Sequence, residues 1–367
     1  MNNTSYPTIQ LGFVKLTDAA PYVVAKELGF FAQYGLSVEL RPQNSWTTLR
    51  DKLETGLLDA AQMLAPMPLA SALGISGARR DIITPLITSQ NGNGITLSMS
   101  LCNEIKELSS LDEIPFPMPA FLLKKAIESR KSKQQNKLTF ASVFPFSCHY
   151  LQLLDYFSAG DINTDDVEFV FMPPTSMADS LDSADIDGFC VGGPYNATSV
   201  RKHSGATVAT SYDIWQDQAE KVLGITNEAY QQRPNMYHLL CAALIDACEW
   251  LKDVPNRFEA ARILADEHYL DTAIDYIAPS LIGSCLTSAN TAPRHIPHYN
   301  RFSSVFANAA QQAYSVNRPS HVQGEWLLSK VQMAWPHLCK QDVNTSLVSA
   351  CFREDIFKQA LASRLHK

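Results

Sequence analysis

The chain has no long apolar run and no excess of positive charge. None of its 367 residues lies in a stretch of the roughly 18 apolar residues that a membrane-spanning helix needs. Lysine and arginine together number 30, against 37 aspartates and glutamates, which gives a formal net charge of −7 at pH 7. Nucleic-acid-binding proteins concentrate positive charge to neutralise phosphates, so this composition argues against that class. An anionic ligand would need a local positive partner.

Paired cysteines and an export signal are also missing. The eight cysteines include no Cys-x-x-Cys pair and mostly lie in apolar surroundings, which favours buried reduced thiols over disulfides. The N-terminal stretch "MNNTSYPTIQLGFVKLTDAAP" has neither the basic segment nor the apolar core of a secretory signal. Both features predict a cytoplasmic protein. The alternative is a periplasmic protein whose export signal has been removed.

Motifs of common enzymes are absent as well. The sequence has no Ser-His-Asp spacing, nucleophile elbow, phosphate-binding loop or His-Glu-x-x-His motif. Cys148 and His149 are adjacent, so their side chains diverge on a helix and make a poor pair of nucleophile and base. We therefore expect a protein that is not an enzyme and that uses no cofactor and no metal.

Strand-like and helix-like segments alternate along the chain, and its length suggests two lobes. The expected strands are residues 9–14, 36–40, 60–64, 138–143, 167–171 and 186–191. The expected helices include residues 19–28, residues 149–157 and a helix that Ser45 caps, with Leu49, Leu53 and Leu57 on one face. From Pro234 onward the chain is mainly helical. This alternation predicts an α/β fold.

Glycine is scarce, with 16 residues in the chain, yet Gly192 and Gly193 are adjacent in "DGFCVGGPYN". They follow an expected strand, and Pro194 suits the first position of a following helix. Backbone N–H groups at a helix start attract anions, and the missing side chains let a ligand approach closely. The alternative is a tight strand-to-helix turn without a ligand.

Four further residues can contact an anion, and each has a structural alternative. His149 falls in the first turn of a helix that Ser147 can cap, where its imidazole can donate to a ligand or serve the structure alone. Trp46 can turn its indole N–H to a ligand or pack in the core. Gln90, in "ITSQNGNGITLS", can donate its amide or be a polar surface residue. Lys221, in "QDQAEKVLGIT", can be the counter-charge of an anion or a solvent-exposed lysine.

Five stretches together resemble one family. They are "LGFVKLTDAAPYVVAKELGFFAQYGLSVEL", "SWTTLRDKLETGLLDAAQMLAPMPLASALGI", "QNGNGITLS", "DGFCVGGPYN" and "IWQDQAEKVLGIT". In them the sequence is similar to the nitrate-binding and bicarbonate-binding solute receptors of bacterial ABC transporters. The resemblance runs from about residue 9 to the C-terminus, and its "LDAAQMLAPMPLA" motif is highly specific.

The resemblance implies a two-lobed, type II periplasmic-binding-protein-like fold with two crossover strands and mixed sheets flanked by helices. Lobe one would comprise residues 1–98 and the mainly helical residues 206–367, and lobe two residues 99–205. In nitrate-binding members a tryptophan, a glutamine, a histidine, a lysine and a backbone amide hold the anion in the cleft between the lobes. By position these correspond to Trp46, Gln90, His149, Lys221 and Gly192.

The sequence departs from the family pattern at two points. The usual Glu and Trp after "VG" are Gly193 and Tyr195 here, which removes a charge near the expected site. The export signal of the transporter receptors is not found either. Cytoplasmic relatives are nitrate and nitrite sensors that hold an RNA-binding antitermination protein inactive until the anion arrives, and the sequence looks most like one of these. The resemblance therefore implies a cytoplasmic sensor that controls nitrate-assimilation genes. The alternative is the exported binding component of a nitrate or bicarbonate ABC transporter, with the permease as its partner.

The expected ligand is nitrate or nitrite. Nitrate is planar, weakly basic and singly charged, and it suits neutral N–H donors with one lysine. Glu220, next to Lys221, leaves a calcium-assisted bicarbonate site open, and the fold class leaves an enzyme or a binder of a small organic ligand open. Replacing His149 or Lys221 by alanine is expected to weaken nitrate binding about tenfold or more and to leave the fold intact.

Overall fold

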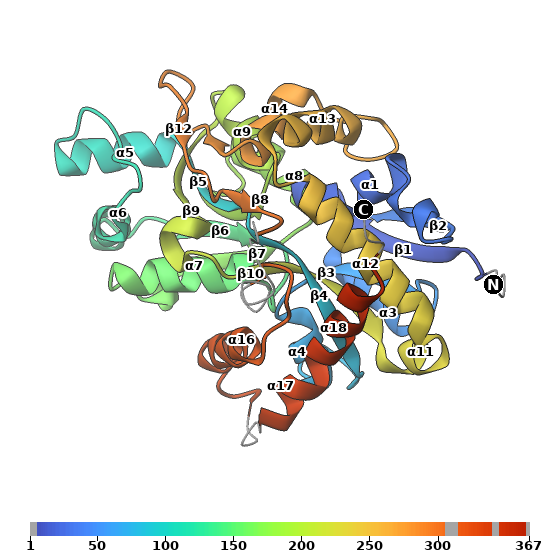
Figure 1. Ribbon diagram of the computed structural model, residues 1–367. Coiled ribbons are helices and arrows are strands. Elements are labelled where there is room, and N and C mark those ends of the chain that lie inside the picture. Colours follow the sequence, from blue (N-terminus) through green and yellow to red (C-terminus); the bar gives the residue numbers. More distant parts are fainter. Residues whose placement is uncertain (1–5, 305–314, 340–344, 365–367) are drawn as a thin grey trace. The chain divides into compact units, whose positions relative to one another are not determined.

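The computed structural model describes residues 6–304, 315–339 and 345–364. The chain divides into two compact units. The first unit consists of Met1–Gln90, Gln218–Asp271 and Arg301–Lys367, and the second unit of Asn91–Asp217 and Thr272–Asn300. Each unit has its own sheet, and the helices of each can be followed in Figure 1.

The observed division differs from the expected one. The first two boundaries follow residues 90 and 217 instead of 98 and 205, because the strands at residues 93–98 and 205–210 pair with each other in the second sheet. Residues 272–300 also belong to the second unit, although we expected them in lobe one. A main-chain hydrogen bond of 3.0 Å from Thr207 N to Thr287 O helps to hold this segment against the second sheet. The helix-like sequence pattern of residues 272–300 did not predict that they attach to the second sheet.

The sheet of the first unit has six strands in the order β13-β4-β10-β3-β1-β2. They are β1 (Ile9–Val14), β2 (Val38–Gln43), β3 (Ala60–Leu64), β4 (Ile82–Asn91), β10 (Ala219–Thr226) and β13 (Asn300–Arg301). β1 runs parallel to β2 and β3, whereas β10 is antiparallel to β3 and β4. β10 is buried from Ala219 to Ile225, so a charged residue there stands in the core.

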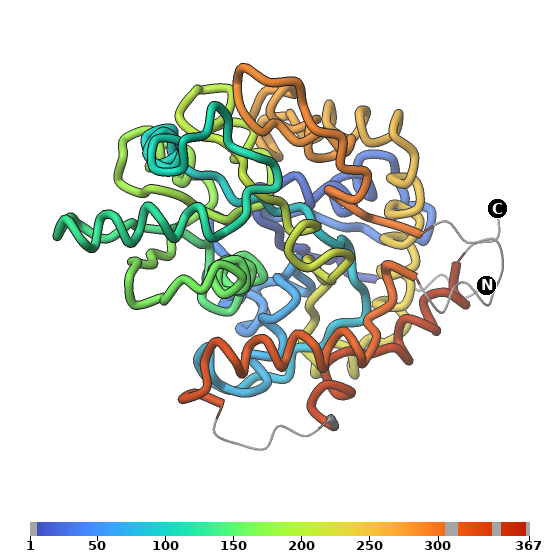
Figure 2. Tube along the Cα trace, turned by 90° about the vertical axis from the view of Figure 1, so that its left-hand side faces the viewer, coloured from blue at the N-terminus to red at the C-terminus, as the bar shows by residue number. Residues whose placement is uncertain are grey.

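Helices pack around this sheet, and α12 is the longest in the described part of the first unit. They are α1 (Ala20–Glu27), α2 (Phe30–Gln33), α3 (Trp46–Glu54), α4 (Met67–Leu73), α11 (Asn227–Gln232), α12 (Pro234–Trp250), α13 (Val254–Leu264), α16 (His321–Ala334), α17 (Thr345–Cys351) and α18 (Glu354–Ala362), with a 3-10 turn η1 (Thr17–Ala19). α12 packs against α1, α2 and α18. Figure 2 traces α16, α17 and α18 in red along the C-terminal part of the chain.

The helix that follows β2 agrees with the sequence at its start and differs at its end. The Ser45 hydroxyl accepts a hydrogen bond of 3.1 Å from Thr48 N, which confirms Ser45 as the N-cap of α3. Leu49 and Leu53 are buried as expected. Leu57 is 67% exposed, because α3 ends at Glu54 and the chain turns at Gly56, whose φ of +75° suits glycine. The expected three-leucine face was therefore wrong at its last member.

The sheet of the second unit has five strands in the order β7-β6-β8-β5-β9. They are β5 (Asn93–Ser98), β6 (Leu138–Ser142), β7 (Val167–Phe171), β8 (Gly188–Gly192) and β9 (Gly205–Thr210). The expected strands at 138–143, 167–171 and 186–191 match β6, β7 and β8 within two residues at each end. A side chain at Gly188 would place its Cβ 2.9 Å from Leu97 Cδ2 and from Phe140 Cε1, so these side chains would have to shift.

The helices of the second unit are α5 (Met99–Ser109), α6 (Ala120–Ser132), α7 (Cys148–Ala159), α8 (Pro174–Asp182), α9 (Tyr195–Arg201), α10 (Ser211–Trp215) and α14 (Ile274–Leu281). A 3-10 turn η2 (Thr164–Asp166) precedes β7, and the short strands β11 (Ser284–Cys285) and β12 (Arg294–His295) pair with each other. α7 packs against β8, and its Phe157 meets Phe140 with ring centroids 5.0 Å apart. This contact joins α7 to the core of the sheet.

None of the helices within the described residues is long and apolar enough to cross a membrane. All eight cysteines lie in the described residues outside any disulfide, and seven of them are buried, as the sequence predicted for reduced thiols. Burial raises the pKa of the Cys285 thiol to about 12, so this thiol stays neutral.

Candidate functional site

Lys221 lies in the middle of the first sheet, and its side chain is fully buried. Its ammonium group is 2.9 Å from Asp18 Oδ2 and 2.9 Å from Glu220 Oε1, and both carboxylates are 1% exposed. We refer to Asp18, Glu220 and Lys221 as the charged cluster. A buried lysine without such partners would cost several kcal/mol, so the carboxylates explain how the ammonium is tolerated.

An irregularity in β10 brings the last two members of the cluster together. Ala219 is opposite Gln90 and Lys221 is opposite Ser89, so Glu220 is an extra residue in β10 at this point. Neighbouring residues of a regular strand point to opposite faces of the sheet, whereas a β-bulge redirects a side chain. The bulge lets the adjacent Glu220 and Lys221 side chains meet.

Asp18 was missed by the sequence analysis, although it completes the charged cluster. It lies in η1, just after β1, and its Oδ1 accepts a hydrogen bond of 2.7 Å from Gln62 Nε2. Gln62 in turn accepts a hydrogen bond of 3.2 Å from Val14 N, which fixes the amide. The sequence signal for Asp18 was its position just after an expected strand. That signal is too weak to identify a site residue. The expected site of uncharged donors and one ammonium thus contains two carboxylates in addition.

Trp46 is the first residue of α3, and its side chain is fully buried. The centre of its ring is 5.9 Å from Lys221 Nζ, within the range of a cation–π contact. Its indole Nε1–H is buried and finds no acceptor among the residues that the structure describes. A buried donor without an acceptor costs about 1–3 kcal/mol, which an oxygen atom of a ligand would recover.

Gln90 and Ser89 lie side by side near the end of β4. Gln90 is 5% exposed, and its side-chain oxygen accepts a long hydrogen bond of 3.5 Å from Arg301 Nη1. That contact leaves its amide N–H groups to donate elsewhere. Ser89 is fully buried, and its hydroxyl has no hydrogen-bond partner in the described part of the chain. Ser89 is the register partner of Lys221, next to the irregularity in β10.

His149 and Gly192, the other two expected ligands, lie in the second unit. His149 is fully buried in the first turn of α7, and the Ser147 hydroxyl caps that helix by accepting a bond of 3.0 Å from Tyr150 N. Gly192 is the last residue of β8, which packs against α7. Pro194 is the N-cap residue of α9, one position before the place that the sequence predicted for it. The strand-to-helix turn itself is as expected.

A buried amide beside Gly192 was also missed. Asn93 is the register partner of Gly192, and its Nδ2 donates a hydrogen bond of 2.9 Å to Gln152 Oε1. The Cys190 thiol shares that acceptor at 3.7 Å. Asn93 Oδ1 is buried and has no donor among the residues that the structure describes. The run "QNGNG" suggested a glycine-rich turn, so a buried acceptor was not expected there.

The structure therefore brings Trp46, Gln90 and Lys221 together in the first unit, and it places His149 and Gly192 in the second unit, on the packed elements α7 and β8. Within the described ranges, no group of three or more histidine, cysteine, aspartate or glutamate side chains is arranged to hold a metal ion.

Comparisons with known proteins bear on this arrangement. The sequence pattern of the NMT1-like family matches residues 3–265. The chain is 33% identical over 356 residues to the nitrate import ATP-binding protein NrtC of Synechocystis sp., which covers 96% of this chain and 49% of that protein. It is 30% identical over 358 residues to the nitrate/nitrite binding protein NrtA of Nostoc sp., with 96% of this chain and 76% of that protein covered. The chain thus spans about half the length of the NrtC relative.

The fold agrees with that of a solved relative. The crystal structure of the periplasmic nitrate-binding protein NrtA from Synechocystis PCC 6803 matches 97% of this chain and 88% of its own chain, with a TM-score of 0.85 and 25% identity. This match confirms the two-lobed α/β fold of the periplasmic-binding-protein type. The family match over residues 3–265 covers more than half of the chain. The chain therefore belongs to the NMT1-like family, in the group of ABC-transporter solute-binding proteins that the sequence resembled.

Proposed function

We propose that the protein binds nitrate or nitrite as the solute receptor of an ABC-type transport system. The observation that carries this proposal is the buried indole N–H of Trp46, which lacks an acceptor among the described residues, beside the ammonium of Lys221. A small anion would accept from the indole and gain from the positive charge. The nitrate-binding relatives NrtA support the same ligand.

The chemistry of the first unit suits a weakly basic anion of single charge. The ring N–H of Trp46, the amide of Gln90 and the hydroxyl of Ser89 are neutral donors, which match the spread charge of nitrate. The two carboxylates of the charged cluster would repel a second negative charge, so a divalent anion such as sulfate is disfavoured. Four heavy atoms at about 1.5 kcal/mol each correspond to a dissociation constant on the order of tens of micromolar.

His149 and Gly192 remain proposed ligands from the second unit. The buried imidazole can donate a hydrogen bond, and the backbone N–H at the end of β8 can donate another. His149→Ala is expected to weaken nitrate binding about tenfold without unfolding the protein. The matched control is His203→Ala, at an exposed position of the same unit.

The deciding experiment is calorimetry with nitrate, nitrite, bicarbonate and sulfate on the wild type and on Trp46→Phe. The substitution keeps an aromatic ring over Lys221 and removes the N–H donor. Nitrate affinity should fall about tenfold to a hundredfold, the effect of one hydrogen bond to a charged ligand. Trp250→Phe, at a half-buried position at the end of α12, is the matched control. Equal nitrate affinity in the wild type and Trp46→Phe would contradict the proposal.

Bicarbonate is the second candidate ligand, because Asn93 Oδ1 is a buried acceptor without a donor in the described residues. Nitrate has no proton to offer it, whereas the hydroxyl of bicarbonate does. If bicarbonate is the ligand, Asn93→Asp should alter bicarbonate affinity while leaving nitrate affinity much less affected. Bicarbonate binding tighter than nitrate in the wild type would favour this candidate.

The role in transport is supported by the relatives named above, which are a nitrate import component and nitrate-binding proteins. The periplasmic NrtA supports a periplasmic location in the same way. The finer expectation of a cytoplasmic sensor that acts through an RNA-binding antitermination regulator has no such support. A pull-down with and without nitrate separates the two roles. Recovery of a permease supports the transport role, and release of a small RNA-binding regulator by nitrate supports the sensor.

A further inference from the structure

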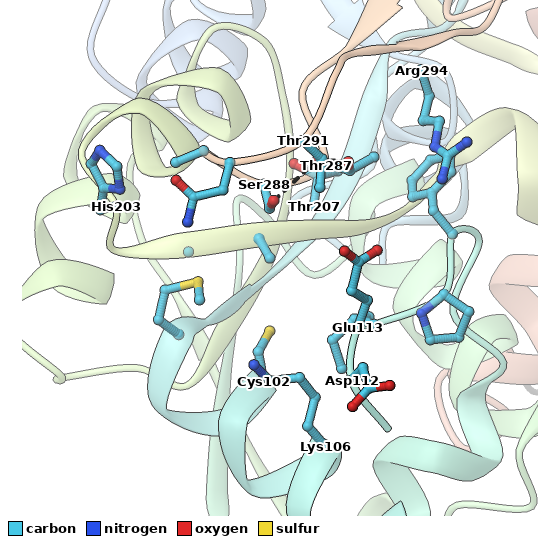
Figure 3. Close-up of a pocket in the computed structure, with 18 residues that line it drawn as sticks. Cys102, Lys106, Asp112, Glu113, His203, Thr207, Thr287, Ser288, Thr291 and Arg294 are labelled. Atoms are coloured by element: carbon cyan, nitrogen blue, oxygen red, sulfur yellow. Dashed lines mark hydrogen bonds between the residues drawn. The ribbon is translucent and has the colours of Figure 1, made fainter. Parts of the chain in front are cut away.

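A pocket of about 260 Å³ lies within the second unit, and none of the residues that line it is a proposed nitrate ligand (Figure 3). Its walls come from α5, the loop at residues 112–116, the edge strand β9 and the segment at residues 287–294. Ligand pockets for drug-sized molecules measure roughly 300–1,000 Å³, so this pocket suits a smaller molecule.

One wall of the pocket is apolar. Met99 and Cys102 lie one turn apart on α5, with Ala206 of β9 and Phe116 also lining the pocket. The Cys102 thiol points into the pocket in Figure 3. Burial raises its pKa to about 12, so it stays uncharged and acts as a small apolar surface. The wall can therefore hold an aliphatic group but no charge.

A second wall consists of the side-chain hydroxyl groups of Thr287, Ser288 and Thr291. These residues form a turn that hydrogen bonds stabilise. Thr287 and Ser288 each form a hydrogen bond with the hydroxyl of Thr291, at 3.0 and 3.1 Å. The turn is anchored to β9 because Thr207 N donates to Thr287 O at 3.0 Å. The turn is thus held by bonds of its own and does not depend on a ligand for its shape.

Charges of both signs reach the pocket from different segments. In Figure 3 the Glu113 carboxylate points into the pocket, and the Arg294 guanidinium points toward it from the segment on the other side. Neither side chain has an ion-pair partner in the part of the chain that the structure describes. An acceptor of an ammonium group and a donor to a carboxylate are therefore both present, with an apolar wall near them.

We propose that this pocket binds a free α-amino acid with an aliphatic side chain. The Arg294 guanidinium would bind the carboxylate of the amino acid through a bidentate pair of hydrogen bonds. The Glu113 carboxylate would accept hydrogen bonds from the ammonium group of the amino acid. The side chain would lie against Met99 and Cys102. The inference does not rest on the proposed nitrate site.

Calorimetry on the whole chain tests the proposal with L-leucine and L-methionine as probes. Isocaproate lacks the ammonium group of leucine and isoamylamine lacks its carboxylate, so each tests one charge. We expect both amino acids to bind and both analogues to bind at least about tenfold more weakly. An absence of amino-acid binding at millimolar concentration, or an analogue that binds as tightly as leucine, overturns the proposal.

Variants locate the binding to this pocket. Glu113→Gln and Arg294→Gln should each weaken leucine binding about tenfold or more. The matched controls are Glu107→Gln, on an exposed position of α5 outside the pocket lining, and Arg79→Gln, an exposed residue of the first unit. Ala289→Trp should block the pocket, since Ala289 is an exposed residue of its lining, and its unfolding temperature should equal that of the wild type. Leucine binding that is equal in all variants would contradict the assignment.

Discussion

Lys221 Nζ is 2.9 Å from Asp18 Oδ2, although one residue lies in β10 and the other in the turn after β1. Both side chains are at most 1% exposed, and Glu220 adds a second carboxylate at 2.9 Å. With all three groups ionised, the charged cluster has a net charge of −1. An anion that reaches Lys221 therefore also approaches two carboxylates, and this balance limits what the site can bind.

Asp18→Asn should tighten nitrate binding about fivefold to tenfold, because it removes one repulsive charge and keeps the shape of the side chain. Sulfate binding should become measurable in the same variant. Calorimetry with both anions checks the expectation. Asp59→Asn is the matched control, since it breaks the ion pair with Arg233 elsewhere in the first unit. Weaker nitrate binding in Asp18→Asn would show that the carboxylate serves mainly to orient Lys221.

Lys221→Met should lower the free energy of unfolding by about 3–5 kcal/mol, because it leaves two buried carboxylates without their counter-charge. Urea denaturation measures the loss. The triple variant Asp18→Asn, Glu220→Gln, Lys221→Met should regain most of it while binding no nitrate. If Lys221→Met alone is as stable as the wild type, the cluster is not ionised as described.

Ser89→Ala should weaken nitrate binding about tenfold to a hundredfold, the effect of one lost hydrogen bond to an anion. Its stability should stay close to that of the wild type, because the hydroxyl has no partner among the described residues to lose. Calorimetry and thermal unfolding check the two parts. Ser132→Ala, at an exposed position, is the control. An unchanged nitrate affinity would remove Ser89 from the site.

Glu354 should make the stability of the first unit depend on acid pH. Burial raises the pKa of its carboxyl group, but hydrogen bonds from Arg318 and from His321 N outweigh this and lower the pKa below 4.5. A lowered pKa in the folded state means that the stabilisation is present above the unfolded value and is lost as the pH falls through the folded value. Glu354→Gln should cost about 1–2 kcal/mol near pH 7 and much less near pH 3.

Denaturation curves of both proteins across this pH range measure the difference. Glu259→Gln, whose contact with Arg262 is exposed, should cost little at any pH. A penalty for Glu354→Gln that is the same at both pH values would contradict the assignment.

Local features of the chain could be predicted from sequence. The cap at Ser45, the strand at residues 9–14 and the helix turn that holds His149 each depend on neighbours within a few positions. The same holds for the family resemblance, which rests on short stretches of sequence. These features gave the fold class and the five expected ligands.

Contacts between distant segments could not be predicted. Asp18, Gln62 and Asn93 gain their roles from partners on other strands and helices, so nothing beside them in sequence marks them. The attachment of residues 272–300 to the second unit depends in the same way on a bond to the edge of β9.

The sequence alone determined that a lysine follows Glu220 at the position of the family's lysine ligand. Only the tertiary structure decided that this lysine is buried between two carboxylates, because a bulge and a turn from far along the chain bring them together. We therefore expect Lys221→Ala to destabilise the protein, whereas the sequence predicted weaker nitrate binding with the fold intact. Whether a charged side chain is stable in a protein core depends on the groups that surround it in space. The order of residues in the sequence does not give those neighbours.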